Sequence, residues 1–304
     1  MILPVKVSVT EEGTRLGRWL MRHYGDTNMI AIRKMCRSGE IRINSKRCLP
    51  DHMLMAGDMV RIPPMVTTGK PGIEKKDIHP KMTFSLAELE KLRKAIIHND
   101  EDIVIFNKPA GLAVQGGGGI KKSLDKMAAA LFPHDTVLLV HRLDKETSGI
   151  IVVAKNQMAA QKLAYDFQTK NVHKEYLALL AGNVSQKSGT ITEQINGKAA
   201  ITEYSVIGEL KDHLTFVRFM PHTGRKHQLR IHAAFALGAP IVGDDLYGSR
   251  SDIGGMKSFL SSGHLHLFAQ KISFKHPRTN KILTIKASAP EWMCSVATLC
   301  EIEL

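Results

Sequence analysis

The chain has 304 residues and a formal net charge of +13, with 42 Lys and Arg against 29 Asp and Glu. This excess of cations favours a polyanionic partner, either nucleic acid or an anionic membrane face, because contact with a polyphosphate releases its counterions. No apolar run approaches the roughly 20 residues that cross a bilayer, and acidic residues and Gly interrupt the N-terminal segment too early for a signal peptide. We therefore expect a cytoplasmic protein with no membrane partner.

Neither the cysteines nor the histidines have the spacing of a metal site. The four cysteines include no CxxC pair, and we expect them to be reduced thiols. His222, His227 and His232 are five residues apart, a spacing that does not return to one helical face. His264 and His266 share a strand face but lack an accompanying HExxH pattern. We expect structural or RNA-contacting histidines and no metal.

The first predicted helix, in TRLGRWLMRHY, has an apolar face and a cationic face. Leu16, Trp19 and Leu20 recur at helical spacing, while Arg15 and Arg18 lie on another side. Such a helix can contact phosphates, but a solvated charged face or a helix lying on a membrane surface has the same pattern.

A second predicted helix runs from about Met29 to Arg37 and ends before Gly39, a residue type that readily takes the left-handed conformation at a helix end. It carries Arg33, Lys34 and Arg37. The segments GEIRIN and GDMVRI follow as short strands, and NSK forms a turn between them.

The order helix, helix, GEIRIN, turn, GDMVRI resembles the S4 RNA-binding module over about fifty residues. The resemblance rests on Arg15-Leu16, Gly39, Asn44 and Gly57-Asp58. It implies an RNA-binding domain over residues 1–66. The residues expected to contact RNA are Arg15, Arg18, Arg33, Lys34 and Arg37.

Residues 67–94 read as a linker, rich in turn residues, that ends in a short helix begun by the capping-box pair Ser85 and Glu88. Residues 95–304 form the second expected domain. Strands are expected at 103–106, 137–140, 150–154, 173–180, 264–274 and 281–287, and helices at 157–169 and over RKHQLRIHAAFALG, the latter capped by Thr223. The alternation of strand and helix that builds a doubly wound sheet is absent. The predicted fold class is α+β, with a small α/β module followed by a mixed, mainly antiparallel sheet and flanking helices.

The glycine run in QGGGGI does not indicate a nucleotide site. It is followed neither by GK[ST] nor by the spaced GxGxxG that opens a helix, so a P-loop or a Rossmann turn is excluded. We interpret the run as a flexible loop over a polyanion.

The densest cluster of charge is HRLDKETSG, residues 141–149, which follows an apolar strand. Asp144 lies between Arg142 and Lys145, cations that favour its ionised form and suit it to act as a nucleophile or a base. Thr147 and Ser148 lack a GxSxG context and are expected to shape the turn. One charged carboxylate in a basic cleft favours isomerisation or covalent catalysis over redox chemistry.

Together, NKPAGLAV, HRLDKETSGIIVVAK, KEYLALLAG and HTGRKHQLRIHAAFALGAPIVGDDLYG resemble the RluA-type pseudouridine synthases, in the same order and across nearly all of residues 95–304. An S4 module ahead of this domain is similar to the arrangement in the ribosomal large-subunit synthases. The resemblance implies conversion of uridine to pseudouridine in large-subunit RNA, without cofactor or metal.

The resemblance also implies roles for individual residues. Asp144 matches the aspartate that attacks the target nucleotide, Tyr176 the aromatic that lies against the flipped uracil, and Arg230 the arginine that pairs with that aspartate. Arg142 matches the arginine that fills the space left by the uridine, with simple phosphate contact as its alternative.

Four further residues are expected to bind the substrate: Leu229, Ile231, Arg225 and His227. Asp144 could instead be half of a structural ion pair, Tyr176 a core aromatic and Arg230 a solvated helix residue. We expect a monomer that binds RNA and not DNA. Two alternatives stay open: a non-catalytic RNA-binding or ribosome-assembly factor, and the same reaction on transfer or messenger RNA.

Overall fold

A computed structural model describes residues 4–24, 29–63, 84–117, 120, 122–210, 214–248, 264–299 and 301–302. The chain forms two compact units, Met1–Lys81 and Met82–Leu304, which are described separately. Residues 67–83 of the expected linker and two glycines of the QGGGGI run lie outside the described residues. Among the described helices, none combines the length and apolarity that a membrane span requires.

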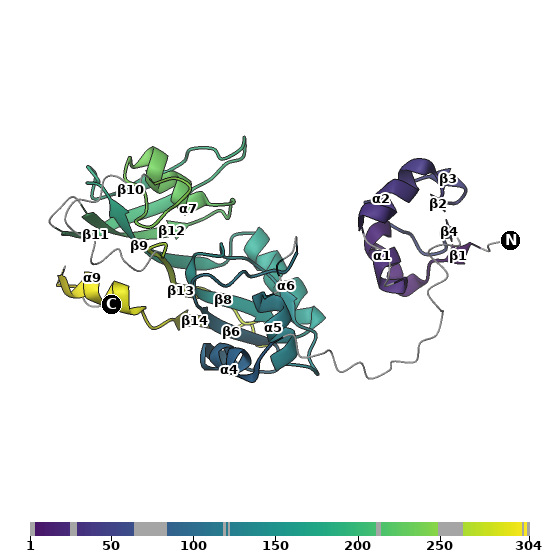
Figure 1. The fold of residues 1–304 in the computed structure, drawn as a ribbon, viewed down its shortest axis with the longest axis horizontal. Coiled ribbons are helices and arrows are strands. Elements are labelled where there is room, and N and C mark those ends of the chain that lie inside the picture. Colours follow the sequence, from purple (N-terminus) through teal and green to yellow (C-terminus); the bar gives the residue numbers. More distant parts are fainter. Residues whose placement is uncertain are drawn as a thin grey trace. The chain divides into compact units, whose positions relative to one another are not determined.

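The small unit is a four-stranded antiparallel sheet with two helices (Figure 1). Its elements are β1 (Val5–Lys6), the 3-10 turn Val9–Glu11, α1 (Leu16–His23), α2 (Met29–Ser38), β2 (Arg42–Ile43), β3 (Lys46–Arg47) and β4 (Met59–Arg61), with strand order β1-β4-β2-β3. The predicted apolar face of α1 is confirmed, since Leu16, Trp19 and Leu20 are buried against Ile32 of α2. Gly39 ends α2 with a φ of 77°, the left-handed conformation predicted for it.

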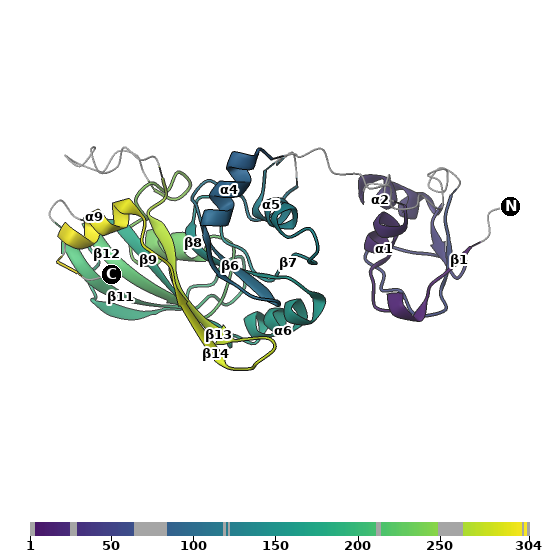
Figure 2. The same ribbon diagram turned by 90° about the horizontal axis from the view of Figure 1, so that it is seen from below.

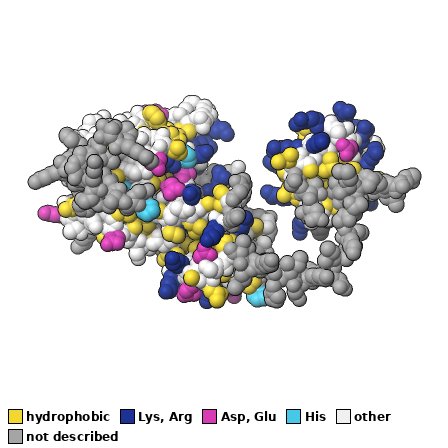
Figure 3. Space-filling model, in the orientation of Figure 1, with side chains coloured by type: hydrophobic (Ala, Val, Ile, Leu, Met, Phe, Trp, Pro, Cys, Tyr) yellow, Lys and Arg dark blue, Asp and Glu magenta, His cyan; other side chains and the backbone are white. Residues whose placement is uncertain are grey.

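The cations of the small unit stay on its surface. Figure 3 shows Lys and Arg side chains over much of its visible face. All five residues that we expected to contact RNA are exposed: Arg15, Arg18, Arg33, Lys34 and Arg37.

The large unit is built on a ten-stranded, mainly antiparallel sheet, which confirms the predicted fold class. Its strands are β5 (Ile96–Asn99), β6 (Ile103–Lys108), β7 (Leu138–Leu139), β8 (Ser148–Ala154), β9 (His173–Ala181), β10 (Ser188–Ile191), β11 (Thr202–Leu210), β12 (Leu214–Pro221), β13 (Leu267–Lys275) and β14 (Ile282–Lys286). The order is β10-β11-β12-β9-β13-β8-β6-β5, with β14 paired to β13 and β7 to β8. Only β13 and β8 pair in parallel among these described strands.

Helices cover both faces of this sheet around β8 (Figure 2). The helices beside β8 are α4 (Leu86–Lys94), α5 (Leu124–Leu131) and α6 (Gln157–Gln168), and the large unit also contains α7 (Gln228–Ile231) and α9 (Glu291–Leu299). Alternate residues of β8 enter different cores: Ile151 joins the cluster formed with α4 and α5, and Val152 joins the cluster formed with α6 and α9. Burial on both sides holds β8 rigidly, and the HRLDKETSG segment leads directly into it.

The helix that we assigned to the linker packs in the large unit. Its capping box is confirmed, because the backbone N–H of Glu88 donates to the Ser85 hydroxyl (3.2 Å) and the Glu88 carboxylate accepts from the Ser85 backbone N–H (2.8 Å). Leu92 is buried in the same cluster as Phe106 of β6.

The predicted helix over RKHQLRIHAAFALG, capped by Thr223, is wrong at its start. The helix α7 begins at Gln228, with His227 at the N-cap in the left-handed conformation, and continues as a π-helical turn from His232 to Ala236. The Thr223 hydroxyl donates instead to the Gln228 side chain (2.7 Å) and accepts from the backbone N–H of Ile201 (2.9 Å). These bonds fasten the loop before α7 to the start of β11, so the hydroxyl is not free to cap a helix.

Candidate active site

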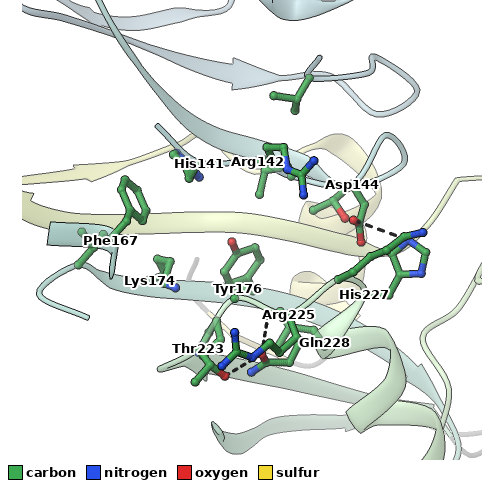
Figure 4. A pocket seen from close by; sticks show the side chains of 18 of the residues that line it. His141, Arg142, Asp144, Phe167, Lys174, Tyr176, Thr223, Arg225, His227 and Gln228 are labelled. Atoms are coloured by element: carbon green, nitrogen blue, oxygen red, sulfur yellow. Dashed lines mark hydrogen bonds and ion pairs between the residues drawn. The ribbon is translucent and has the colours of Figure 1, made fainter. Parts of the chain in front are cut away.

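A cavity of about 1070 Å³ lies where four distant segments meet. They are the segment from the end of β7 to the start of β8, the segment from the end of α6 into β9, the segment from the end of β12 through α7, and residues 113–115. Leu267 of β13 completes the lining. Figure 4 shows Arg142 and Asp144 on one side of this pocket, with Tyr176 and Lys174 of β9 facing them. Of the eight residues expected from the sequence to be catalytic or to bind the substrate, seven line the pocket and Ile231 does not.

Asp144 lies in a tight turn at the pocket wall. The backbone N–H of Thr147 donates to the Asp144 carbonyl (3.1 Å), which supports the expected role of Thr147 in the turn. The Asp144 side chain is 29% exposed, so its carboxylate reaches the cavity while most of its surface is covered. Arg142 is exposed beside it and also lines the pocket.

A buried lysine side chain holds this turn through hydrogen bonds to backbone carbonyl groups. The Lys108 ammonium donates to the carbonyl oxygens of Pro109 (3.0 Å), Leu112 (2.9 Å) and Lys145 (3.0 Å). Burial lowers the pKa of Lys108 to about 7, although the charges of Glu146 and Asp144 oppose the shift. Lys108 therefore links the NKPAGL turn to the residue that directly follows Asp144.

Two side chains of β9 point into the pocket because alternate residues of a strand share a face. Tyr176 and Lys174 both line it, whereas Glu175 between them pairs with Lys271 of β13 (2.7 Å). Burial, together with the Asp144 charge, raises the pKa of Tyr176, so its hydroxyl is protonated at neutral pH. Burial lowers the pKa of Lys174.

His141 begins the charged segment but is uncharged. Its Nε2 accepts a hydrogen bond from the backbone N–H of Val152 (2.9 Å), and its ring stacks on Phe167 with centroids 4.5 Å apart. Burial and the nearby Lys174 charge lower the pKa of His141 to about 3. His141 thus fixes the start of the segment against β8 as a neutral imidazole.

The predicted pairing of Arg230 with Asp144 is not present in the structure. Arg230 forms two hydrogen bonds with Asp244, from Nε (2.7 Å) and from Nη2 (2.6 Å). Both side chains are buried, at 6% and 0% exposure, and a buried carboxylate requires a paired cation. Burial would lower the pKa of Arg230, but the hydrogen bonds and the charge of Asp244 raise it, and the charge of Asp144 adds to the rise.

The imidazole of His227 lies beside Asp144. Its Nε2 lies 3.8 Å from the Asp144 Oδ1, and its Nδ1 lies 2.9 Å from the Tyr247 hydroxyl (Figure 4 shows the first contact). Burial lowers the pKa of His227, with Asp144 opposing and Arg230 reinforcing the shift. The imidazole is therefore neutral at pH 7.

The remaining predicted substrate residues separate into two groups. Leu229 is buried and lines the pocket, and Arg225 lines it with an exposed side chain whose Nε donates to the Ala199 carbonyl (3.0 Å). Ile231 is half-buried outside the pocket lining, because two residues along a helix lie on different faces.

One group of described residues has the geometry of a cation site: Asp100, Asp102 and His276. Arg278 already occupies the Asp102 carboxylate with two hydrogen bonds (2.6 and 2.8 Å), and His98 and His276 both contact Asp100. This cluster is an ion-pair network between the β5–β6 turn and the β13–β14 turn.

The comparisons with known proteins agree with this fold and pocket. Residues 102–235 match the model of the RNA pseudouridylate synthase family. The chain belongs to this family and is a pseudouridine synthase, an isomerase.

Its relatives include the ribosomal large subunit pseudouridine synthase C of Vibrio vulnificus, which is 35% identical over 92% of this chain and 90% of the relative. The protein of the same name from Escherichia coli K12 is 34% identical over 94% of this chain and 93% of the relative. Among solved structures, human RNA pseudouridylate synthase domain containing 4 superimposes with a TM-score of 0.59 at 27% identity, covering 71% of this chain and 96% of that one.

Several residues that shape the site were missed by the sequence reasoning. Lys108, Lys174, Asp244 and Tyr247 all lie in segments that carry the resemblance, NKPAGLAV, KEYLALLAG and VGDDLYG. Asp244 and Tyr247 could have been noticed in the sequence, because the polar run GDDLYG directly follows the apolar residues APIV. Nothing in the sequence indicated that Lys108 is buried or that Lys174 lines the pocket, because lysine is ordinarily exposed.

Proposed function

We propose that this protein converts uridine to pseudouridine in ribosomal RNA of the large subunit. The observation that carries the proposal is the convergence of Asp144, Tyr176, Arg142 and Leu229 on one pocket from three segments distant in the sequence. The names of the relatives from Vibrio vulnificus and Escherichia coli support the choice of substrate.

In the proposed reaction, the bond from N1 of uracil to C1′ of ribose breaks and a bond from C5 to C1′ forms. C5 loses a proton and N1 gains one, so the product is an isomer of the substrate. Asp144 acts on the ribose as a nucleophile or a base while it is ionised. Tyr176 presents its ring to the uracil. Its hydroxyl starts protonated, releases its own proton to water and then accepts the proton from C5, while water supplies the proton that N1 gains.

Arg230 acts in this proposal through its charge and through Asp244. The guanidinium stabilises anionic Asp144 from beyond hydrogen-bonding distance, and the two bonds to Asp244 hold α7 in place. Leu229 covers the base on the face opposite Tyr176. Arg142 enters the stack that the uridine leaves, which offsets part of the few kcal/mol that unstacking costs.

The small unit is proposed as an S4-type RNA-binding domain over residues 1–66. Its exposed Arg15, Arg18, Arg33, Lys34 and Arg37 suit phosphate contacts that carry no sequence information. Selection of the uridine then depends on local RNA shape and unpaired bases. We place the protein in the cytoplasm as a monomer that uses neither metal nor cofactor, with Ile231 outside the substrate contacts.

The test is to map pseudouridine in RNA after incubation with the pure protein. Unmodified large-subunit RNA, transfer RNA and assembling particles are treated in parallel, and pseudouridine is located by carbodiimide labelling and primer extension. New stops at discrete uridines of large-subunit RNA are expected. Stops confined to transfer RNA would reassign the substrate, and none in any RNA would favour the non-catalytic binding factor.

A further inference from the structure

A chain of polar groups runs from the interior of the large unit to the pocket. Asp244 accepts hydrogen bonds from the backbone N–H groups of Leu246 (2.9 Å) and Tyr247 (3.1 Å), as well as from Arg230. The Arg230 guanidinium also lies over the Tyr247 ring, 5.4 Å from its centroid. Tyr247 is therefore held at its backbone and at its ring by one buried ion pair.

Tyr247 contacts His227 through its hydroxyl and through its ring. The hydroxyl lies 2.9 Å from Nδ1, and the rings meet edge to face with centroids 5.7 Å apart. His227 has a φ of 56° and a ψ of 23°, a left-handed conformation that is uncommon for a residue other than Gly. The fold maintains this backbone conformation beside the reacting carboxylate, which points to a function for the side chain.

A neutral imidazole carries one proton, and its neighbours decide which nitrogen holds it. An N–H on Nε2 faces the Asp144 carboxylate favourably, whereas a lone pair there would repel it. With the proton on Nε2, Nδ1 is the acceptor and the Tyr247 hydroxyl is the donor. The Asp144 carboxylate thus favours this tautomer, and the Tyr247 hydroxyl stabilises it by donating to Nδ1.

We propose that Tyr247 and His227 are positioning residues that orient the Asp144 carboxylate for attack, an inference that rests on the proposed function. Nε2–H of His227 holds Oδ1, and the second oxygen of Asp144 is left to meet the ribose. The present separation of 3.8 Å exceeds a hydrogen bond by under 1 Å, and such contacts often close only when the substrate is bound. This role replaces the substrate contact that we expected for His227 from the sequence.

The kinetic test uses His227→Gly, because Gly accepts the left-handed backbone and the variant is expected to fold. Single-turnover tritium release from large-subunit RNA labelled at C5 of uridine is measured with saturating enzyme, with RNA affinity measured separately. We expect the rate to fall by up to about 100-fold, because misplacing a reacting group by about 1 Å can cost that much. RNA affinity should stay nearly unchanged, because His227 is proposed to act on Asp144 and not on the RNA, and added imidazole should restore part of the rate.

Two further variants complete the kinetic comparison. Tyr247→Phe should slow the same step while leaving affinity intact. Asn280→Gly is the matched control, since Asn280 has the same φ of 56° but lies in the β13–β14 turn away from the pocket. Loss of affinity with an unchanged rate in His227→Gly, or no response to imidazole, would overturn the proposal in favour of a substrate contact or a structural role.

A second readout needs no RNA and separates this proposal from the proposed function. Nitrogen NMR of histidine-labelled protein, with His227 assigned from His227→Asn, should show a protonated Nε2 and a bare Nδ1. Tyr247→Phe should shift this towards a mixture of tautomers. A proton on Nδ1 in the unsubstituted protein would overturn the proposal, whereas a correct tautomer in a protein without isomerase activity would refute only the proposed function.

Discussion

The ring and the hydroxyl of Tyr176 have different proposed roles, and one substitution can test them separately. Tyr176→Phe keeps the ring against which the base is proposed to lie and removes the only proton acceptor that the side chain offers. We expect RNA affinity within about two-fold of the original and a single-turnover rate lower by roughly 10²- to 10⁴-fold, the usual contribution of a positioned acid or base. Tritium release under saturating enzyme measures the rate, and an undiminished rate would leave Tyr176 with stacking alone.

The sequence reasoning on single residues succeeded at some positions of the site and failed at others. HRLDKETSG and KEY indicated that Asp144 and Tyr176 share one site, because the motifs stand in the order of the family, and both side chains line one pocket. The partner of Arg230 was predicted wrongly. The choice between Asp144 and Asp244 depends on burial, and only the fold shows that Asp244 is fully buried and already accepts two backbone N–H groups.

At the scale of elements, the junction of the charged segment with β8 depends on one glycine. Gly149 has a φ of +107°, and a Cβ there would lie 2.3 Å from the carbonyl oxygen of Ala269 in β13. Gly149→Ala should therefore lower the free energy of unfolding by more than about 3 kcal/mol, because both backbone strain and overlap oppose it.

A neighbouring glycine supplies the control for this substitution. Gly111 also has a positive φ, +81°, but a Cβ there meets no atom within 4 Å. Gly111→Ala should cost only the backbone term, about 1–2 kcal/mol. Urea unfolding followed by circular dichroism measures both, and equal losses would show that contact with β13 does not matter.

The turns that flank β6 and β13 share a network that should respond to acid. Burial would raise the pKa of Asp100, but hydrogen bonds from His98, from the backbone N–H groups of Ile103 and Asp102, and from His276 lower it to about 2. Because the folded-state pKa is depressed, this stabilisation is complete above the unfolded value near 4 and is lost as the pH falls towards 2.

The prediction compares the pH dependence of the unfolding free energy of the original chain with that of Asp100→Asn. Relative to Asp100→Asn, the original chain should lose roughly 2 kcal/mol of unfolding free energy between pH 4 and pH 2. Chemical unfolding across that range measures it. Parallel curves for both proteins would contradict the proposed contribution of Asp100.

Elements with strong periodicity, such as α6, β9 and the β13–β14 hairpin, followed from the sequence, as did the antiparallel character of the sheet. The segment before α7 did not. Gln228 forms hydrogen bonds with Ile201, Thr202, Thr223 and Arg225, and this long-range network delays the start of the helix. A local cap signal at Thr223 carries no information about a strand more than twenty residues earlier.

At the scale of the whole molecule, the proposed division of labour assigns affinity to the small unit and chemistry to the large one. Replacing Arg33, Lys34 and Arg37 of α2 together by Ala should raise KM at least ten-fold at physiological salt and leave kcat within about two-fold. The slope of log affinity against log salt should become shallower by about 2, since each phosphate contact to a single strand contributes roughly 0.7.

The control for this charge change lies in the β13–β14 hairpin. Lys275, Lys281 and Lys286 are exposed, and replacing them by Ala lowers the net charge of the chain by the same amount. That variant should bind RNA nearly as well as the original. Equal losses in both triple variants would mean that net charge, and not the surface of α2, determines affinity.

The central claim, that Asp144 catalyses isomerisation, is tested most directly by tritium release to water from large-subunit RNA labelled at C5 of uridine. Asp144→Asn keeps the size of the side chain and removes its charge. The account predicts release by the original protein and none above background by the variant, with RNA affinity retained. Release by the variant at the original rate would contradict the assignment of Asp144.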